Sequence, residues 1–296
     1  MLLWSTFLHS FSGVEGACQA LEYQQHGRDA LFFSANLDSA NPCHQLVCTI
    51  AGSFANNKVQ RIVMVGTDAP TANCFIKLHN AEVNSRAVNP ALRVENPKDR
   101  ASVAGLERLT RSFIPVVTAL GEPQPFARLL FAWYGTSPEK VAAVCRDGPR
   151  SLRTTDCGYF GAGSYFALEA AYALRYSSPD DVSGESAVIL FLVSVSQAKV
   201  ITLEGDYRRN EANPHLQGFS QYYSGSRETA VALASKCDAH FIPVKDYGCT
   251  HPLTGQTTCR DVDYQAVDES SGTAEAHELV VGSHHRCIPI AVVYTK

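Results

Sequence analysis

Residues 158–177 read GYFGAGSYFALEAAYALRYS. Three glycines fall within the first six positions, and glycine lets a backbone turn tightly and approach a ligand closely. Tyr165 comes two residues after the last of them, and Tyr176 follows eleven residues later at the end of a helix-like segment. A glycine run of this outline is weak evidence for a phosphate loop on its own, because glycines mark tight turns in many folds. The stretch therefore combines a glycine turn with two aromatic side chains at a fixed spacing.

Two further blocks flank this stretch in the chain. Upstream, residues 132–139 read AWYGTSPE, and the helical segment that follows ends in CRDG at residues 145–148. Downstream, residues 277–281 read HELVV and precede an apolar run that closes the chain. The carboxylate of Glu278 stands just before apolar residues, so its position alone is also typical of a solvated residue at the edge of a strand.

The rest of the chain alternates irregularly between apolar runs and segments with helical spacing. Short apolar runs bounded by turn residues predict buried strands, and apolar residues three or four apart predict helices. Regular alternation of strand and helix, as in a doubly wound nucleotide-binding fold, is not visible, so the pattern favours a mixed α and β fold. The predicted strands are 30–33, 61–65, 129–133, 187–195, 241–244, 279–281 and 288–294, and the predicted helices are 46–54, 71–86, 101–120, 139–145 and 168–176.

Composition limits the classes of function. The chain has 296 residues, of which 45% are hydrophobic and 18% charged, so it can bury a full core. Its formal net charge of −4 argues against strong nucleic-acid binding, which needs many cations to neutralise phosphates. No apolar run approaches the ~20 residues that span a bilayer. Residues 1–8 are apolar but lack basic residues, so we expect neither a secretory signal nor membrane association.

The ten cysteines are spread through a chain large enough to fold without disulfides, which predicts reduced cysteines in a cytoplasmic or nuclear protein. A structural zinc site is the alternative for one group of them. Only Cys237 and His240 have the tight spacing of zinc ligands, and they lead directly into a strand-like segment, so we expect packing and no metal. His240 is then a packed strand residue, while His277, His284 and His285 are expected at the surface. The group also contains Cys249, His251, Cys259 and Cys287.

In this order, the three blocks resemble the catalytic domain of the poly(ADP-ribose) polymerase family, the diphtheria-toxin-like ADP-ribosyltransferases. The middle block is the most specific, since Gly-x-Gly-x-Tyr-Phe with a tyrosine eleven residues on is a rare combination. The resemblance covers about residues 59–296 and leaves residues 1–58 as an N-terminal segment of unknown role. It implies an α+β ADP-ribosyltransferase fold, with a split core of two mixed sheets and flanking helices.

The resemblance also implies functional residues. Gly135 corresponds to the glycine whose backbone holds the nicotinamide carboxamide, and Tyr165 and Tyr176 correspond to the tyrosines that pack against the nicotinamide ring. Tyr134 stands where the family has an NAD+-binding histidine. Glu278 corresponds to the catalytic glutamate. Cleavage of the bond between nicotinamide and ribose develops an oxocarbenium-like cation, which a carboxylate on the ribose 2′-hydroxyl stabilises. Aromatic faces fix the leaving group before the bond breaks.

The implied activity is an NAD+-dependent ADP-ribosyltransferase that moves ADP-ribose from NAD+, its substrate, to side chains of acceptor proteins and releases nicotinamide. Transfer of one unit or of a chain of units, and the oligomeric state, are left open. Two positions depart from the family pattern: Tyr134 replaces the histidine, and Ala173 replaces a serine that bonds the nicotinamide amide. These departures keep a second hypothesis open, a degenerate module that binds NAD+, ADP-ribose or a protein partner without turnover.

Overall fold

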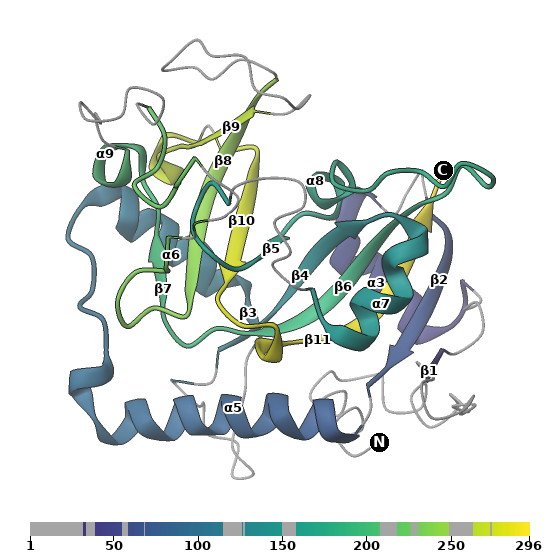
Figure 1. Cartoon of the computed structure of the whole chain (residues 1–296), viewed down its shortest axis with the longest axis horizontal. Coiled ribbons are helices and arrows are strands. Elements are labelled where there is room, and N and C mark those ends of the chain that lie inside the picture. The colour runs from purple at the N-terminus through teal and green to yellow at the C-terminus, as the bar shows by residue number, and fades with distance from the viewer. Residues whose placement is uncertain are drawn as a thin grey trace.

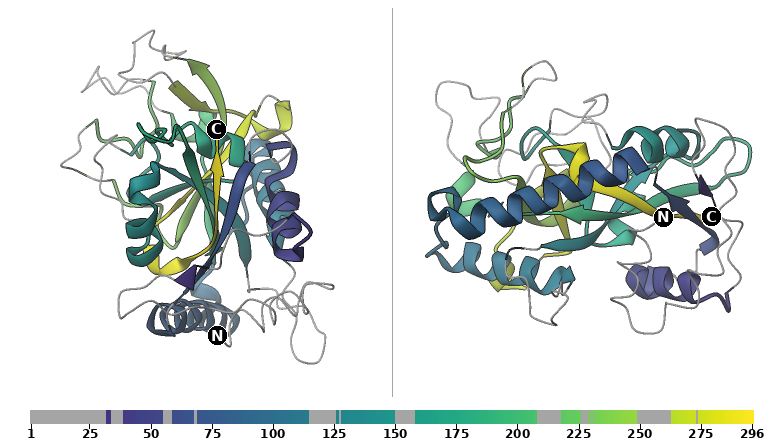
Figure 2. Two further views of the ribbon diagram at one scale, coloured as in Figure 1. Left: turned by 90° about the vertical axis from the view of Figure 1, so that its right-hand side faces the viewer. Right: turned by 90° about the horizontal axis from the view of Figure 1, so that it is seen from below.

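The computed structural model shows a twisted β-sheet with helices packed around it (Figure 1, Figure 2). It describes residues 32–33, 39–54, 59–67, 69–114, 126, 128–149, 158–207, 218–225, 229, 231–248, 263–272 and 274–296. The mixed α and β composition predicted from the sequence is confirmed, and the sheet is largely antiparallel.

Most predicted elements are present, with shifted ends. The strands of the described residues are β1 (Phe32–Phe33), β2 (Val59–Gly66), β3 (Phe113–Ile114), β4 (Leu129–Thr136), β5 (Ser164–Ala167), β6 (Ser186–Ser194), β7 (Ala198–Val200), β8 (Ala239–Gly248), β9 (Asp263–Ala266), β10 (Ala276–Val281) and β11 (Cys287–Thr295). The α-helices are α3 (Pro42–Ala51), α5 (Ala69–Val88), α6 (Arg100–Ser112), α7 (Val141–Asp147), α8 (Ala170–Leu174) and α9 (Leu203–Asp206).

One helix was predicted too long. The sequence predicted a helix over residues 101–120, but α6 ends at Ser112 and Phe113 turns to extended backbone with φ −71° and ψ 137°. Phe113 and Ile114 then pair with β4 as the short strand β3. The residue before a proline is disfavoured in the α region, and Ile114 precedes Pro115, so the chain leaves the helix there.

The sheet has two halves that meet at one residue pair. Its strand order is β1-β2-β11-β6-β4-β5-β10-β8-β7, with β3 added on β4 and β9 on β8. Pairing between β4 and β5 consists of the single bridge Trp133↔Ala167, whereas β4 pairs with β6 along its whole length. β7 and β8 are parallel, and the other pairs are antiparallel. The residues around this narrow joint come from all three blocks that the sequence singled out.

Alternate strand residues face two separate cores. We call them the α3-side core, which contains Val47, Trp133 and Val280, and the α7-side core, which contains Val141 and Leu279. Figure 2 shows α3 and α7 on opposite sides of the half-sheet that holds β4. The segment before residue 59, whose role the sequence left unknown, contributes α3 to the packing of the sheet.

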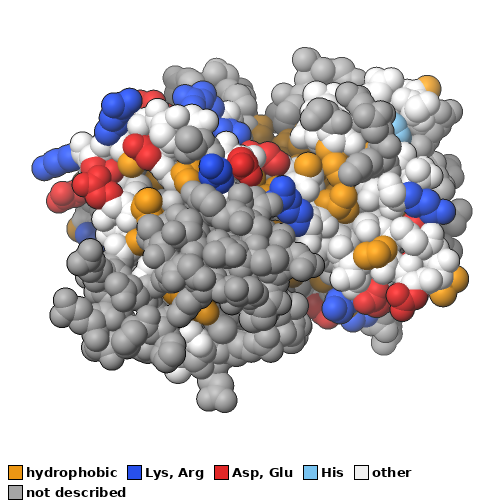
Figure 3. All heavy atoms as spheres, turned by 90° about the horizontal axis from the view of Figure 1, so that it is seen from above, with side chains coloured by type: hydrophobic (Ala, Val, Ile, Leu, Met, Phe, Trp, Pro, Cys, Tyr) orange, Lys and Arg blue, Asp and Glu red, His pale blue; other side chains and the backbone are white. Residues whose placement is uncertain are grey.

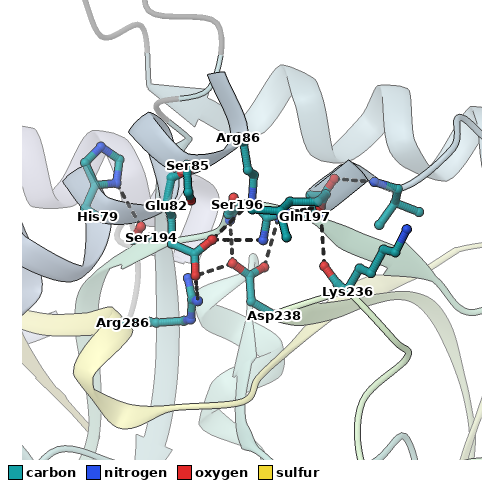
Figure 4. A network of polar contacts seen from close by, with 12 residues as sticks. His79, Glu82, Ser85, Arg86, Ser194, Ser196, Gln197, Lys236, Asp238 and Arg286 are labelled. Atoms are coloured by element: carbon teal, nitrogen blue, oxygen red, sulfur yellow. Dashed lines mark hydrogen bonds and ion pairs between the residues drawn. The ribbon is translucent and has the colours of Figure 1, made fainter. Parts of the chain in front are cut away.

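The long helix α5 is fixed to the body by a buried ionic network (Figure 4). Glu82 on α5 accepts from Arg286 at 2.8 Å and from Arg86 at 2.9 Å. Arg286 also pairs with Asp238 at 2.6 Å, and that carboxylate accepts the backbone N–H of Ser196 and of Gln197. Burial raises the pKa of Asp238 although Arg286 opposes the shift. The network joins α5 to the start of β8 and to the turn before β11.

The surface seen from above carries a mixture of charges (Figure 3). Described Lys and Arg side chains alternate with Asp and Glu on this face, which agrees with the small net charge of the chain. Among the helices that the structure describes, each is too short or too polar to cross a membrane.

Candidate active site around Glu278

Glu278 lies in the middle of the second half-sheet. β10 is a central strand, in which Glu278 pairs with Ala167 of β5 on one side and with Ile242 of β8 on the other. Its side chain faces the α3-side core, since its neighbours two residues away, Ala276 and Val280, both belong to that core. Only 3% of Glu278 is exposed, so the interpretation of this residue as a solvated strand-edge carboxylate is wrong.

Two tyrosine hydroxyls meet the Glu278 carboxylate. The Tyr172 hydroxyl donates to Glu278 Oε1 at 2.8 Å, and the Tyr176 hydroxyl donates to the same oxygen at 3.3 Å. The two hydroxyl oxygens are 3.3 Å apart. A buried carboxylate is strongly destabilising unless it receives hydrogen bonds, and these tyrosines supply them. Burial, followed by the charge of Glu278, raises the pKa of Tyr172 well above its ordinary value, so this hydroxyl stays protonated and donates.

Tyr165 is beside Glu278 in the sheet but bonds to the glycine turn. It pairs with Val280 across β5 and β10, which places it on the same sheet face as Glu278. Its hydroxyl accepts the Phe160 N–H at 2.9 Å and donates to the Gly161 carbonyl at 2.8 Å. Gly161 has φ +105°, a conformation that favours glycine. The glycine run therefore leads into a strand and not into a helix N-terminus, unlike a phosphate loop.

Gly135 lies where β4 touches the end of α8. A Cβ atom on Gly135 would be 1.9 Å from the Ala173 carbonyl oxygen and 3.1 Å from Tyr176 Cβ. Only glycine fits this close approach of two backbones. The structure thus brings Gly135, Tyr176 and Glu278 together, and the role of the Gly135 backbone toward nicotinamide stays a prediction.

Tyr134 is the one sequence-predicted site residue on the opposite face of the sheet. Its ring is partly buried and packs edge-on against Phe166 and Phe191 of the α7-side core, with centroid distances of 5.8 Å and 6.3 Å. Its neighbour Trp133 faces the α3-side core together with the Glu278 side chain. The side chain of Tyr134 and that of Glu278 consequently point to different sides of the sheet.

Sequence reasoning missed Tyr172. Tyr172 and Tyr176 are four residues apart at the α8 turn, and this spacing puts two side chains on one helical face. That spacing was the available signal, since Tyr172 makes the shorter bond to Glu278.

The prediction of a surface position for His277 was wrong, whereas His285 is exposed as predicted. His277 is 8% exposed and lies between two glutamates, 2.7 Å from Glu169 through Nδ1 and 3.0 Å from Glu269 through Nε2. Glu169 also accepts the backbone N–H of His277 at 2.9 Å. The residue next to Glu278 is therefore clamped to the start of α8.

His240 is a packed strand residue, as predicted, and it is fully buried. Its Nε2 accepts the Ala234 N–H at 2.8 Å, so its Nδ1 carries the proton that it shares with the Phe160 carbonyl at 2.7 Å. Burial lowers its pKa to about 4, which keeps the ring neutral.

No group of three or more His, Cys, Asp or Glu side chains that could hold a metal ion occurs among the residues that the structure describes. Of the zinc candidates, Cys249, His251 and Cys259 lie outside the described residues. His240 uses both ring nitrogens in hydrogen bonds to the backbone, so this imidazole has no nitrogen left for a metal in this arrangement.

One family of known proteins matches part of the chain. The family model of the poly(ADP-ribose) polymerase catalytic domain matches residues 108–261, slightly more than half of the chain. The matched span includes the β4 block and the glycine turn with both predicted tyrosines, and it ends before Glu278. No curated protein matches the chain.

Proposed function

Because the chain belongs to the poly(ADP-ribose) polymerase catalytic domain family, a family of ADP-ribosyltransferases that use NAD+, we propose that it transfers ADP-ribose from NAD+ to protein side chains and releases nicotinamide. The observation that carries this proposal is the buried Glu278 carboxylate, which lies within hydrogen-bond distance of the Tyr176 hydroxyl, while Tyr176 lies against Gly135. These three residues come from the three separate sequence blocks.

The proposed step breaks one bond and forms another. The C–N bond between ribose and nicotinamide breaks, and nicotinamide leaves with the bonding electron pair as a neutral molecule. The ribose carbon develops positive charge, which the negative charge of Glu278 stabilises when the carboxylate accepts a hydrogen bond from the ribose 2′-hydroxyl. An acceptor oxygen or nitrogen then bonds to that carbon and loses its proton to a base, a role for which Glu278 is placed if the acceptor is a hydroxyl.

The aromatic side chains prepare this step. Tyr176 is partly buried and packs against the α3-side core, so its ring direction is fixed before NAD+ arrives. Tyr165 is fixed by its two bonds to the glycine turn. A leaving group stacked between rigid rings loses its rotational freedom on binding and not in the transition state.

The experiment is turnover of two labelled forms of NAD+ by folded protein. Label in the nicotinamide reports cleavage, and label in the adenine reports transfer when it becomes bound to protein. We expect free nicotinamide together with protein-bound adenine label. Absence of both products from protein with a cooperative thermal transition would contradict the proposal, and free nicotinamide without bound label would make the chain a hydrolase of NAD+.

One observation favours a second function, a degenerate module that binds NAD+ or ADP-ribose without turnover. Tyr134 occupies the family's histidine position, and its ring packs against the α7-side core, on the sheet face opposite the Glu278 side chain. The chain then supplies no side chain from this position to the dinucleotide. Calorimetry with an NAD+ analogue that cannot be cleaved separates the hypotheses, because this module predicts heat of binding from a protein that releases no nicotinamide from NAD+.

A further inference from the structure

The position of Glu278 within the sheet is fixed by bonds between its neighbour His277 and the two residues just before α8. Glu169, immediately before α8, accepts both the backbone N–H and the Nδ1–H of His277. The Leu168 N–H donates to the His277 carbonyl at 2.9 Å. These contacts hold the β10 backbone against the start of α8. The Glu278 carboxylate can therefore move only by rotation about the side-chain torsions of Glu278.

The Tyr172 hydroxyl is in turn held rigidly. Tyr172 is 5% exposed, its ring lies edge-on to Tyr176 at 5.7 Å, and the Arg175 guanidinium stands over the ring at 5.5 Å. α8 itself is pressed against β4 at Gly135, where the backbones are in contact. A donor fixed in this way holds its acceptor in one orientation.

We propose that Tyr172 is a positioning residue for ADP-ribose transfer: its hydroxyl holds Glu278 Oε1, so that the carboxylate meets the ribose 2′-hydroxyl of NAD+ ionised and in a single orientation. The inference rests on the proposed function. A hydrogen bond donated to a carboxylate favours its charged form, and this effect is large where burial opposes the charge. Tyr176 makes the longer bond to the same oxygen and is half-buried, whereas Tyr172 makes the shorter bond and is buried.

The first test compares Tyr172→Phe with Tyr294→Phe. The Phe ring keeps the contacts of Tyr172 with Tyr176 and Arg175 and removes only the hydroxyl. Tyr294 lies on β11 in the α7-side core, beneath the Arg61 guanidinium, so its variant controls for the general loss of a tyrosine hydroxyl. We expect Tyr172→Phe to lower kcat for nicotinamide release about 10- to 100-fold with KM changed less than about 3-fold, and to move the acid limb of the kcat profile to higher pH. Tyr294→Phe should change neither.

The second test does not depend on turnover. The carboxyl carbon of Glu278, labelled with ¹³C and assigned with Glu278→Gln, is titrated by NMR in the wild type and in Tyr172→Phe. Loss of the donor should move the midpoint of the Glu278 titration to higher pH. Site-specific 3-fluorotyrosine at position 172 is a stronger hydrogen-bond donor and should move the midpoint of the Glu278 titration to lower pH. This variant replaces Tyr172→Phe in the test if Tyr172→Phe does not fold.

The outcomes separate this inference from the proposed function. Absence of turnover in the wild type would contradict the proposed function, and the NMR titration would still decide whether Tyr172 controls Glu278. The inference is overturned if the Glu278 titration is the same in the wild type and in the variant at position 172. It is also overturned if Tyr172→Phe loses only thermal stability and keeps both its kcat and the acid limb of its kcat profile.

Discussion

Replacement of Gly135 by alanine tests the contact between β4 and α8 on which the geometry of the site depends. The added Cβ would lie 1.9 Å from the Ala173 carbonyl oxygen, and ordinary contact begins near 3.4 Å. The strand and the helix would have to move apart by about 1.5 Å, because a backbone carbonyl cannot rotate away as a side chain can. Tyr176 would move with the end of α8, and its 3.3 Å bond to Glu278 would lengthen.

The size of the effect follows from the cost of overpacking. Extra atoms in a packed core destabilise proteins by about 1–3 kcal/mol, and we expect Gly135→Ala at the upper end, about 3 kcal/mol, since the obstacle is backbone. In domains of about 150–250 residues each kcal/mol lowers Tm by roughly 2–4 °C, so Tm should fall by about 6–12 °C. The chain is somewhat longer than this range, which favours the smaller value.

Gly184→Ala is the matched control. Gly184 has φ +67° and no atom within 4 Å of a Cβ placed on it, so the variant carries only the backbone strain of about 1 kcal/mol. Thermal unfolding followed by circular dichroism measures both variants. If Gly135→Ala melts no lower than Gly184→Ala, the close approach of β4 and α8 is wrong, and with it the position of Tyr176 beside Glu278.

Three other predictions follow from the structure. Tyr134→His should give no gain in nicotinamide release, because the new side chain would point toward the α7-side core, and it should lower Tm through loss of the aromatic contacts with Phe166 and Phe191; a gain in turnover would refute this placement. The free energy of unfolding should fall by about 3 kcal/mol between pH 6.5 and pH 4 because of His240. Its pKa is lowered to about 4 in the folded protein, so the unfolded chain takes up a proton at higher pH and is stabilised as the pH falls. A His240→Gln variant measured by urea unfolding should lack most of this fall. Arg286→Met should lower the free energy of unfolding by about 3 kcal/mol, because it leaves the buried carboxylate of Asp238 without its cation, while Glu82 keeps Arg86; urea unfolding that shows a loss of less than about 1 kcal/mol would contradict the role of the network.

The sequence predicted the elements of the fold well where apolar periodicity decides them. β6, β11 and α5 lie within a few residues of their predicted ends, because each is a continuous apolar run or a long helical pattern. β5 was not predicted, since it has only four residues directly after the glycine turn, too few to show an alternation of apolar and polar residues. The extension of helix α6 past Ser112 was predicted because apolar residues continue beyond it, while the chain there changes to strand.

The candidate site was predictable in part for a physical reason. Spacing within one segment locates Tyr165 and Tyr176, but the partner of Glu278 depends on how β10 and α8 meet across the sheet, which no local pattern contains. The same limit applies to His277, whose burial comes from Glu169 and Glu269 on separate elements. Strand alternation could have placed Tyr134 opposite Trp133, once the two cores were known.

The most direct measurement is nicotinamide release from labelled NAD+ by the wild type and by Glu278→Gln. The amide oxygen can still accept from Tyr172, so the variant should keep its thermal stability while it loses the negative charge that stabilises the ribose cation. We expect measurable release by the wild type and a decrease of about 100-fold or more in the variant. Equal release by the two folded proteins would show that Glu278 does not act on NAD+, and would contradict the central claim.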